Sequence, residues 1–476
     1  MKSIKLYTLI ALLFAMAACS ENVMDSINVN PNNPKQIASR FILTDVMTST
    51  AFSITGADYA FYSSVYMELN VGIFGQMYNA ETRVSEPISS TTYNNVWNSQ
   101  YANLYELKIV RDKCSAGGNE AGNVVNLGIA QVLTAYNLAM LTDVMGDVPY
   151  TEALQPGVIY QPKLDKQEAL YTEVFKMLDD AIANFAKTTT FPSIGTQDLI
   201  FAGDKAKWIK AAQGLKARYL MRLSLKNPQY QKVLDAAALS FAAATDEFKY
   251  NYTGSNSVNP FSRFQQDRNY FGTSKSLNDK LVARNDPRKA KFFKPYTGLT
   301  VLNLANNGTT DPRQNFYGIS AYTSATNPTY LMSFHELQFL KAEAYARMSP
   351  AQTANAETAL KLGISAAFVK VGLTAVDAAT YYTTSVKPLF DADPLKEIMM
   401  QKYLSAYEDE SVEAYNDYRR TAAMGSNLVD LANTLQFPQR FTYGSSDVTT
   451  NNNVKSAYGD GTYVYTDKVW WAGGTR

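Results

Sequence analysis

The clearest pattern in the chain lies between residues 124 and 145, where bulky apolar side chains recur every three or four positions. That spacing places them along one face of an α-helix. Gly128, Ala135 and Ala139 form a second face, which is made of small residues. We therefore predict a helix that packs against two neighbours at once and that ends at Gly146, because glycine commonly terminates helices.

Six further segments have the same helical spacing of apolar residues. We predict helices over 167–185, 205–225, 331–348, 354–371, 395–407 and 411–420. Two other stretches are rich in small polar residues, glycine and tyrosine, which predicts long ordered loops with a few short strands, over 250–330 and 437–476. Helical segments lie on both sides of the first of these loop-rich stretches. We therefore expect one mostly α-helical domain over 36–476, in which pairs of helices can stack, although no clean internal repeat is visible.

The N-terminus has the pattern of a secretory signal. Lys2 and Lys5 precede a mostly apolar run over 6–18, which is too short to span a membrane and ends in small residues. Cys19 follows two alanines, as in a bacterial lipobox, although Met16 stands where leucine is usual.

We predict that residues 1–18 are a signal peptide and that Cys19 becomes the acylated N-terminus, carrying palmitate-type chains. The polar residues 19–35 would then be a tether between the outer membrane and the folded domain. The alternative is an ordinary signal peptide followed by a cysteine that is there by coincidence.

Charge and rare residues exclude several classes of function. The chain has 44 basic and 43 acidic residues, so it lacks the positive excess that a nucleic-acid partner requires. Cys114 has no disulfide partner once Cys19 is acylated, and the single histidine, His335, excludes a multi-histidine zinc site. No glycine-rich phosphate loop is present. We therefore expect no cofactor, although loops rich in Asp and Asn could hold a structural calcium ion.

One pair of carboxylates must be weighed as a hydrolase site. Glu336 and Glu343 are seven residues apart on similar sides of one predicted helix. Glycosidases need two carboxyl groups across an open cleft, whereas these two have alanines beside them and are expected to pack inside the scaffold. Arg419 and Arg420, which are close to Asp417, are expected to form ion pairs between helices.

The positive evidence for binding is aromatic side chains in loops. Sugar rings stack their C–H faces on aromatic rings, while amide and guanidinium groups bind the hydroxyls. Three stretches combine these groups: 74–95, 250–271, which includes Tyr270, and 296–330. From the first and third we predict the ligand-binding residues Phe74, Gln76, Tyr78, Arg83, Tyr93, Asn94, Tyr296, Tyr317 and Tyr322. The alternative for each aromatic residue is a place in the core.

Six short motifs follow one another in a specific order. They are GDVPYTEAL at 146–154, NDPR at 285–288, FHELQFLKAEAYA at 334–346, the pair IMMQKY and AYNDYRRT within 398–421, and VWW at 469–471. Together with the lipobox, this ordered set resembles the SusD/RagB family of surface lipoproteins, and in particular its SusD-like branch.

The resemblance implies a mostly α-helical fold in which tetratricopeptide-like helix pairs support a long loop-rich insert. It also implies a lipoprotein that covers a SusC-like TonB-dependent outer-membrane transporter, binds an oligosaccharide and needs no cofactor. Three alternatives stay open. They are a RagB-like member that binds peptides, a surface glycoside hydrolase, and a purely structural subunit of the transporter.

Overall fold

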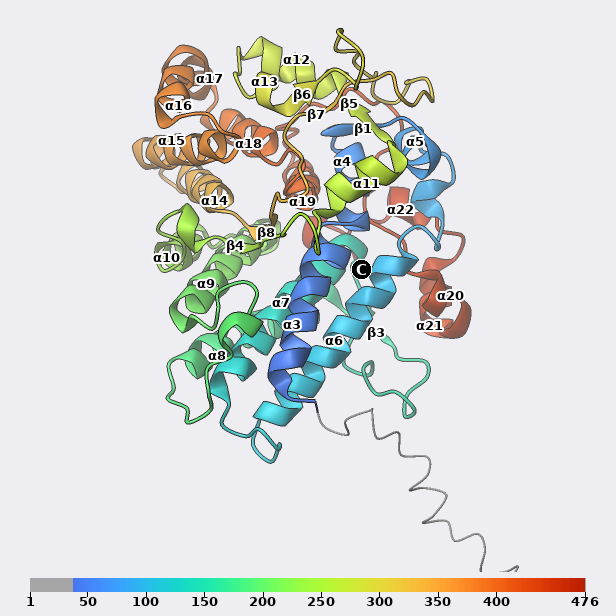
Figure 1. Ribbon diagram of the computed structural model, residues 1–476, viewed down its shortest axis with the longest axis vertical. Helices are drawn as coiled ribbons and strands as arrows, with labels where there is room; N and C mark the ends of the chain where they lie inside the picture. Colours follow the sequence, from blue (N-terminus) through green and yellow to red (C-terminus); the bar gives the residue numbers. More distant parts are fainter. Residues whose placement is uncertain (1–36, 476) are drawn as a thin grey trace, which may run out of the picture.

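The computed structural model describes residues 37–475. The chain is mostly α-helical, as expected (Figure 1). The helices of the first half are α3 (Ser39–Ser49), α4 (Asp58–Tyr66), α5 (Gly75–Glu81), α6 (Asn94–Cys114), α7 (Val124–Met145), α8 (Gln167–Phe185), α9 (Lys205–Arg222) and α10 (Tyr230–Ala238). Those of the second half are α11 (Pro260–Arg268), α12 (Lys275–Ala283), α13 (Lys289–Phe292), α14 (Phe334–Arg347), α15 (Thr353–Lys370), α16 (Ala375–Tyr381), α17 (Lys387–Ala392), α18 (Pro394–Ser405), α19 (Ser411–Ala423), α20 (Ser445–Thr450), α21 (Asn452–Tyr458) and α22 (Tyr463–Thr466).

The strands are short and pair two by two, all antiparallel. The pairs are β1 (Asn70–Gly72) with β5 (Phe271–Thr273), β2 (Val148–Pro149) with β3 (Leu164–Asp165), β4 (Phe248–Tyr250) with β8 (Thr329–Met332), and β6 (Phe293–Lys294) with β7 (Ile319–Ser320). We call the loop-rich stretch 250–330 the insert. Strands β6 and β7 pair inside it, β4 and β8 pair at its two ends, and β5 pairs with β1, which is distant in the sequence. They therefore act as fasteners between segments and do not form a sheet of their own.

The helices that were predicted from periodicity are confirmed, with one shifted start. The predictions over 124–145 and 167–185 match α7 and α8 at both ends. Helix α14 begins three residues later than predicted, because residues 329–332 pair with β4 as a strand. The side chain of Ser333 then accepts a hydrogen bond from the backbone N–H of Glu336 and caps the helix.

The loop-rich stretches contain more helix than predicted. The stretch 250–330 includes three short helices, α11, α12 and α13, and the stretch 437–476 includes α20 to α22. Their starts are set by local caps: for α12, the Ser274 side chain accepts from the backbone N–H of Leu277 at 3.1 Å. Helices of nine residues or fewer have too few turns for periodicity to stand out, which is why these were missed.

Helix α7 is the central helix of the scaffold. It packs between α6 and α8, as its two apolar faces predict. The small face is required, because a Cβ on Gly128 would lie 2.7 Å from the ring of Phe185 on α8. Among the described residues α7 alone is long and apolar enough to cross a membrane, but 89 % of its most apolar window is buried. It is therefore a core helix.

From α8 onward the helices stack side by side. The succession α8, α9, α10, α14, α15 and α16 forms one side of the molecule, and each helix contacts the next (Figure 1). The insert, with α11 and the β1–β5 pair, lies beside α4 and α5 at the other side. Helix α19 contacts α4 and α9. It therefore connects the stack to α4, and through α4 to the side of the molecule where α11 lies.

Buried ion pairs hold the stack together. Arg218 and Arg222 on α9 bind Glu336 on α14 and Asp143 on α7. Arg420 on α19 donates to Glu343 on α14 at 2.7 and 2.8 Å. The three arginine side chains are 2 % exposed or less. Water does not reach these buried groups. A helix packed in the wrong place would therefore leave a buried charge without its partner, which is strongly unfavourable.

We predict that replacing Arg420 with methionine strongly destabilises the protein. The variant Arg420→Met leaves the carboxylates of Glu343 and Asp417 in the core without this guanidinium, which typically costs about 3–5 kcal/mol. Urea unfolding measures this loss. The matched control is Arg263→Met, because Arg263 is 60 % exposed in a surface pair with Asp267, and we expect a loss below about 1 kcal/mol. Equal losses in the two variants would contradict the assignment.

The same ion pairs predict how stability depends on pH. Burial alone would raise the pKa of Glu343, but Arg420 and Arg347 outweigh it and lower the pKa to about 2. The unfolded value is about 4.3. Since the folded pKa is the lower one, the stabilisation is complete above about pH 4.3 and is lost as the pH falls toward 2.

We therefore expect the difference in free energy of unfolding between the wild type and Glu343→Gln to be largest above about pH 5. The difference should shrink steadily between about pH 4 and pH 3, because Glu343 in the unfolded wild type takes up a proton there while Glu343 in the folded protein stays ionised. Urea unfolding at a series of pH values measures it. A difference that does not change over this range would show that the pKa of Glu343 is not lowered in the folded protein.

Candidate functional site

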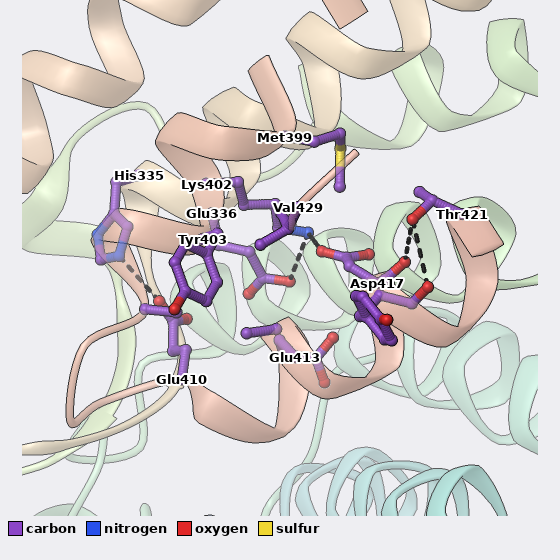
Figure 2. Close-up of a pocket in the computed structure, with 13 residues that line it drawn as sticks. His335, Glu336, Met399, Lys402, Tyr403, Glu410, Glu413, Asp417, Thr421 and Val429 are labelled. Carbon is purple, nitrogen blue, oxygen red and sulfur yellow. Dashed lines mark hydrogen bonds and ion pairs between the residues drawn. The ribbon is translucent and has the colours of Figure 1, made fainter. Parts of the chain in front are cut away.

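The charged residues of α14, α18 and α19 enclose a small hollow (Figure 2). Its volume is about 20 Å³, enough for about one water molecule. Lys402 extends across it, with Nζ 2.7 Å from Asp417 and 4.0 Å from Glu336. Because the hollow has no room for a substrate, these charges are a structural feature and not a binding site.

The carboxylates that were weighed as a hydrolase pair are each bound to an arginine. Glu336 accepts from Arg218 and Glu343 accepts from Arg420. Burial raises the pKa of Glu336 to about 7, with Arg218 acting in the opposite direction. Burial and the nearby Lys370 lower the pKa of His335 to about 3, so its ring is neutral. The expectation that both glutamates pack inside the scaffold is confirmed.

Of the predicted ligand-binding residues, Phe74, Gln76 and Tyr78 lie at the start of α5. Phe74 is 41 % exposed, Gln76 is exposed and Tyr78 is half-buried. The ring of Phe74 lies 5.7 Å from that of Tyr270, which follows α11. Gly75 makes this approach feasible: its φ is +54°, and a Cβ there would lie 2.6 Å from the Tyr270 ring.

Three other predicted residues of the first stretch have structural contacts. Tyr93 is fully buried and stacks on Phe441 with ring centroids 4.3 Å apart, so its ring has no free face for a ligand. The guanidinium of Arg83 lies 4.8 Å above the ring of Tyr66. Asn94 Oδ1 accepts a hydrogen bond at 2.8 Å from the backbone N–H at the start of α20. The side chains of these three residues therefore hold parts of the core and of the C-terminal segment in place.

The predicted residues of the third stretch do not join Phe74. Tyr317 is buried in a small cluster with Val71 and Ile73, so its inclusion as a ligand-binding residue needs correction. Tyr322 lies under the ammonium group of Lys370 at 5.7 Å, and burial raises its pKa well above the usual value. Tyr296 is half-buried in a turn. These side chains support the insert and leave little ring surface free.

Three aromatic residues outside the core do come together, and we call them the aromatic cluster: Phe74, which is exposed, and Phe264 and Tyr270, which are half-buried. Phe264 is perpendicular to Tyr270 at 5.8 Å and rests on Phe61 in the core at 4.5 Å. The cluster lies where α5 and α11 are neighbours (Figure 1).

Amide side chains surround the cluster. Asn269 Nδ2 donates to Asn315 Oδ1 at 2.7 Å, and Gln314 donates to the backbone carbonyl of Arg268 at 2.7 Å. These bonds join the second and third aromatic stretches of the sequence, and the contact between Phe74 and Tyr270 adds the first. Phe264 was missed because the helix α11 was not predicted, so the direction of its side chain could not be foreseen. The signal that could have found the cluster is Gly75 next to Phe74, since glycine allows another side chain to approach closely.

No metal or reactive thiol adds to this site. Within residues 37–475, no group of three or more His, Cys, Asp or Glu side chains could hold a metal ion. The structural calcium ion therefore stays a prediction without an assigned position. Burial raises the pKa of Cys114 to about 11, which makes its thiol unreactive. Cys19 lies outside the described residues.

The comparisons with known proteins agree on one family. The family model described as "Starch-binding associating with outer membrane", SusD-like, matches residues 31–444. None of the curated proteins is similar enough to match. A SusD/RagB family protein of Bacteroides thetaiotaomicron is 41 % identical, with a TM-score of 0.85 over 93 % of this chain and 100 % of that one.

Two less similar solved structures share the fold. A chitin-binding SusD homologue from Flavobacterium johnsoniae is 20 % identical, with a TM-score of 0.73 over 90 % of this chain and 98 % of that one. A SusD homologue from Parabacteroides distasonis is 19 % identical, with a TM-score of 0.75 over 92 % and 99 %. With a family model matched along most of its length, the chain belongs to the SusD-like family, whose members are outer-membrane-associated binding proteins and not enzymes.

Proposed function

We propose that this protein binds a glycan at the aromatic cluster and delivers it to a SusC-like TonB-dependent transporter in the outer membrane. The observation that carries the proposal is the exposed ring of Phe74 beside Tyr270, with amide side chains around them. Ring faces suit the C–H faces of sugars, and amides suit their hydroxyls. The starch-binding description of the family and the chitin-binding homologue support a glycan as the ligand.

The cluster suits capture followed by release. Stacking contributes about 0.5–1.5 kcal/mol per ring pair, so a few rings hold a ligand without making its departure slow. The rings themselves are supported from below, because Phe264 packs on Phe61. A rigid support lowers the entropy lost on binding.

Peptide binding is the second candidate. The relative with 41 % identity is described as a SusD/RagB family protein, a description that fits either candidate. Tyrosine and amide side chains also suit peptides. Calorimetric titration with both glycans and peptides separates the two candidates, and a protein that bound neither would be the structural subunit instead.

We expect Phe74→Ala and Tyr270→Ala each to weaken binding of the best oligosaccharide about three- to tenfold, because each removes one stacking ring. Isothermal titration calorimetry measures the change. The control is Phe41→Ala on α3, because Phe41 is also an exposed phenylalanine, at 49 %, and is outside the cluster. If all three variants bound like the wild type, the cluster would not be the glycan site.

The proposed location depends on the lipid anchor. We expect that the wild type expressed in a Bacteroidetes host incorporates labelled palmitate and fractionates with the outer membrane. Cys19→Ser should abolish both, because no acyl chain can then be attached. Cys114→Ser is the matched control and should keep both. Membrane association of Cys19→Ser at the wild-type level would overturn the proposed anchor.

A further inference from the structure

A separate hollow lies behind the aromatic cluster, between α11, the β1–β5 pair, β7 and the turn that joins α18 to α19. Its volume is about 170 Å³, which is room for about five or six water molecules. Phe261 and Phe271 form an apolar wall, and most of the other lining side chains are amides and hydroxyls. Phe271 also contacts Phe264 of the aromatic cluster, at 5.3 Å, so one layer of rings separates the two places.

Glu408 is the buried acid of this hollow. It stands in the α18–α19 turn with φ at +59°, an uncommon conformation for a residue other than glycine. Ser320 donates to its Oε2 at 2.6 Å. Burial raises the pKa of Glu408 to about 8, although Ser320 and Tyr407 act in the opposite direction. At neutral pH the group is therefore mostly an uncharged carboxylic acid, which can both donate and accept hydrogen bonds.

One polar atom in the wall of the hollow lacks a partner. Asn70 is 3 % exposed, lines the hollow and forms a side-chain hydrogen bond with Glu408. The buried hydroxyl of Thr323, which also lines the hollow, makes no hydrogen bond. Buried donors nearly always have a partner. A polar molecule inside the hollow would satisfy this hydroxyl.

We infer that this hollow is a binding site for one uncharged, hydroxyl-rich molecule of the size of a single sugar unit. An uncharged acid, lining amide side chains and the free hydroxyl of Thr323 offer the mixture of donors and acceptors that sugar hydroxyls need. The rings of Phe261 and Phe271 offer an apolar face to its C–H groups. The inference goes beyond the proposed function, because it concerns a second site that holds one unit and not a chain.

The experiment is calorimetric titration with the methyl glycosides of glucose, galactose, mannose, xylose, 6-deoxygalactose and N-acetylglucosamine. We expect at least one to bind the wild type. In Gln266→Trp, a bulky ring replaces an exposed lining residue of α11, and binding should weaken at least tenfold. In Thr323→Val, which keeps the volume but removes the free hydroxyl, binding should weaken about three- to tenfold.

The control is Asp267→Trp, which places the same ring on the next residue of α11, outside the lining of the hollow. It should bind the glycoside like the wild type, and thermal unfolding should show all variants folded. The inference is overturned if none of the glycosides binds, or if Gln266→Trp and Asp267→Trp bind equally well. This result is independent of the oligosaccharide titrations of Phe74→Ala, which test the proposed function alone.

Discussion

The structure depends on charges that are buried among its helices. Each of three arginines, Arg218, Arg222 and Arg420, forms an ion pair with a carboxylate on a helix other than its own. Water is excluded from all of these ion pairs. Desolvating an ion is so unfavourable that a misplaced helix would leave charges without partners. We take the network to select one arrangement of α7, α9, α14 and α19. It also explains the sequence motifs, because Glu336 and Glu343 belong to the motif at 334–346 and Arg420 to the motif that ends at 421.

Buried carboxylates also attach the insert to the scaffold. Glu68 is fully buried, and its carboxylate accepts from the backbone N–H groups of Ala432 at 2.9 Å and Asn433 at 2.5 Å. Glu81, at the end of α5, accepts from the backbone N–H of Gly308 at 2.5 Å. These two glutamates thus attach the loop at 432–433 and the loop at Gly308 to the segment that contains α4 and α5. The start of α5, where Phe74 lies, is held in place by these contacts.

Helices could be predicted from the sequence, but the direction of loop side chains could not. Periodicity and Gly146 located α7 because both signals are local. Tyr93 stands among Ser, Thr and Asn residues in the sequence and Phe74 follows an apolar stretch, yet Tyr93 is buried against Phe441 and Phe74 is exposed. The difference comes from Phe441, which is more than three hundred residues away. No local pattern contains that information, so the candidate site could be located only to a stretch and not to its residues.

The buried charged side chains of the core differ in kind from the side chains of the aromatic cluster. Several of the largest fully buried side chains are arginines, among them Arg222, Arg288 and Arg420. The aromatic cluster itself consists of rings and is bordered by amide side chains. In the proposed site, a ligand would be held through ring faces and amide groups. Its binding should therefore change little with ionic strength, because salt screens charges and leaves stacking and amide contacts intact. The rings of the cluster are thus the reason that we propose a glycan as its ligand.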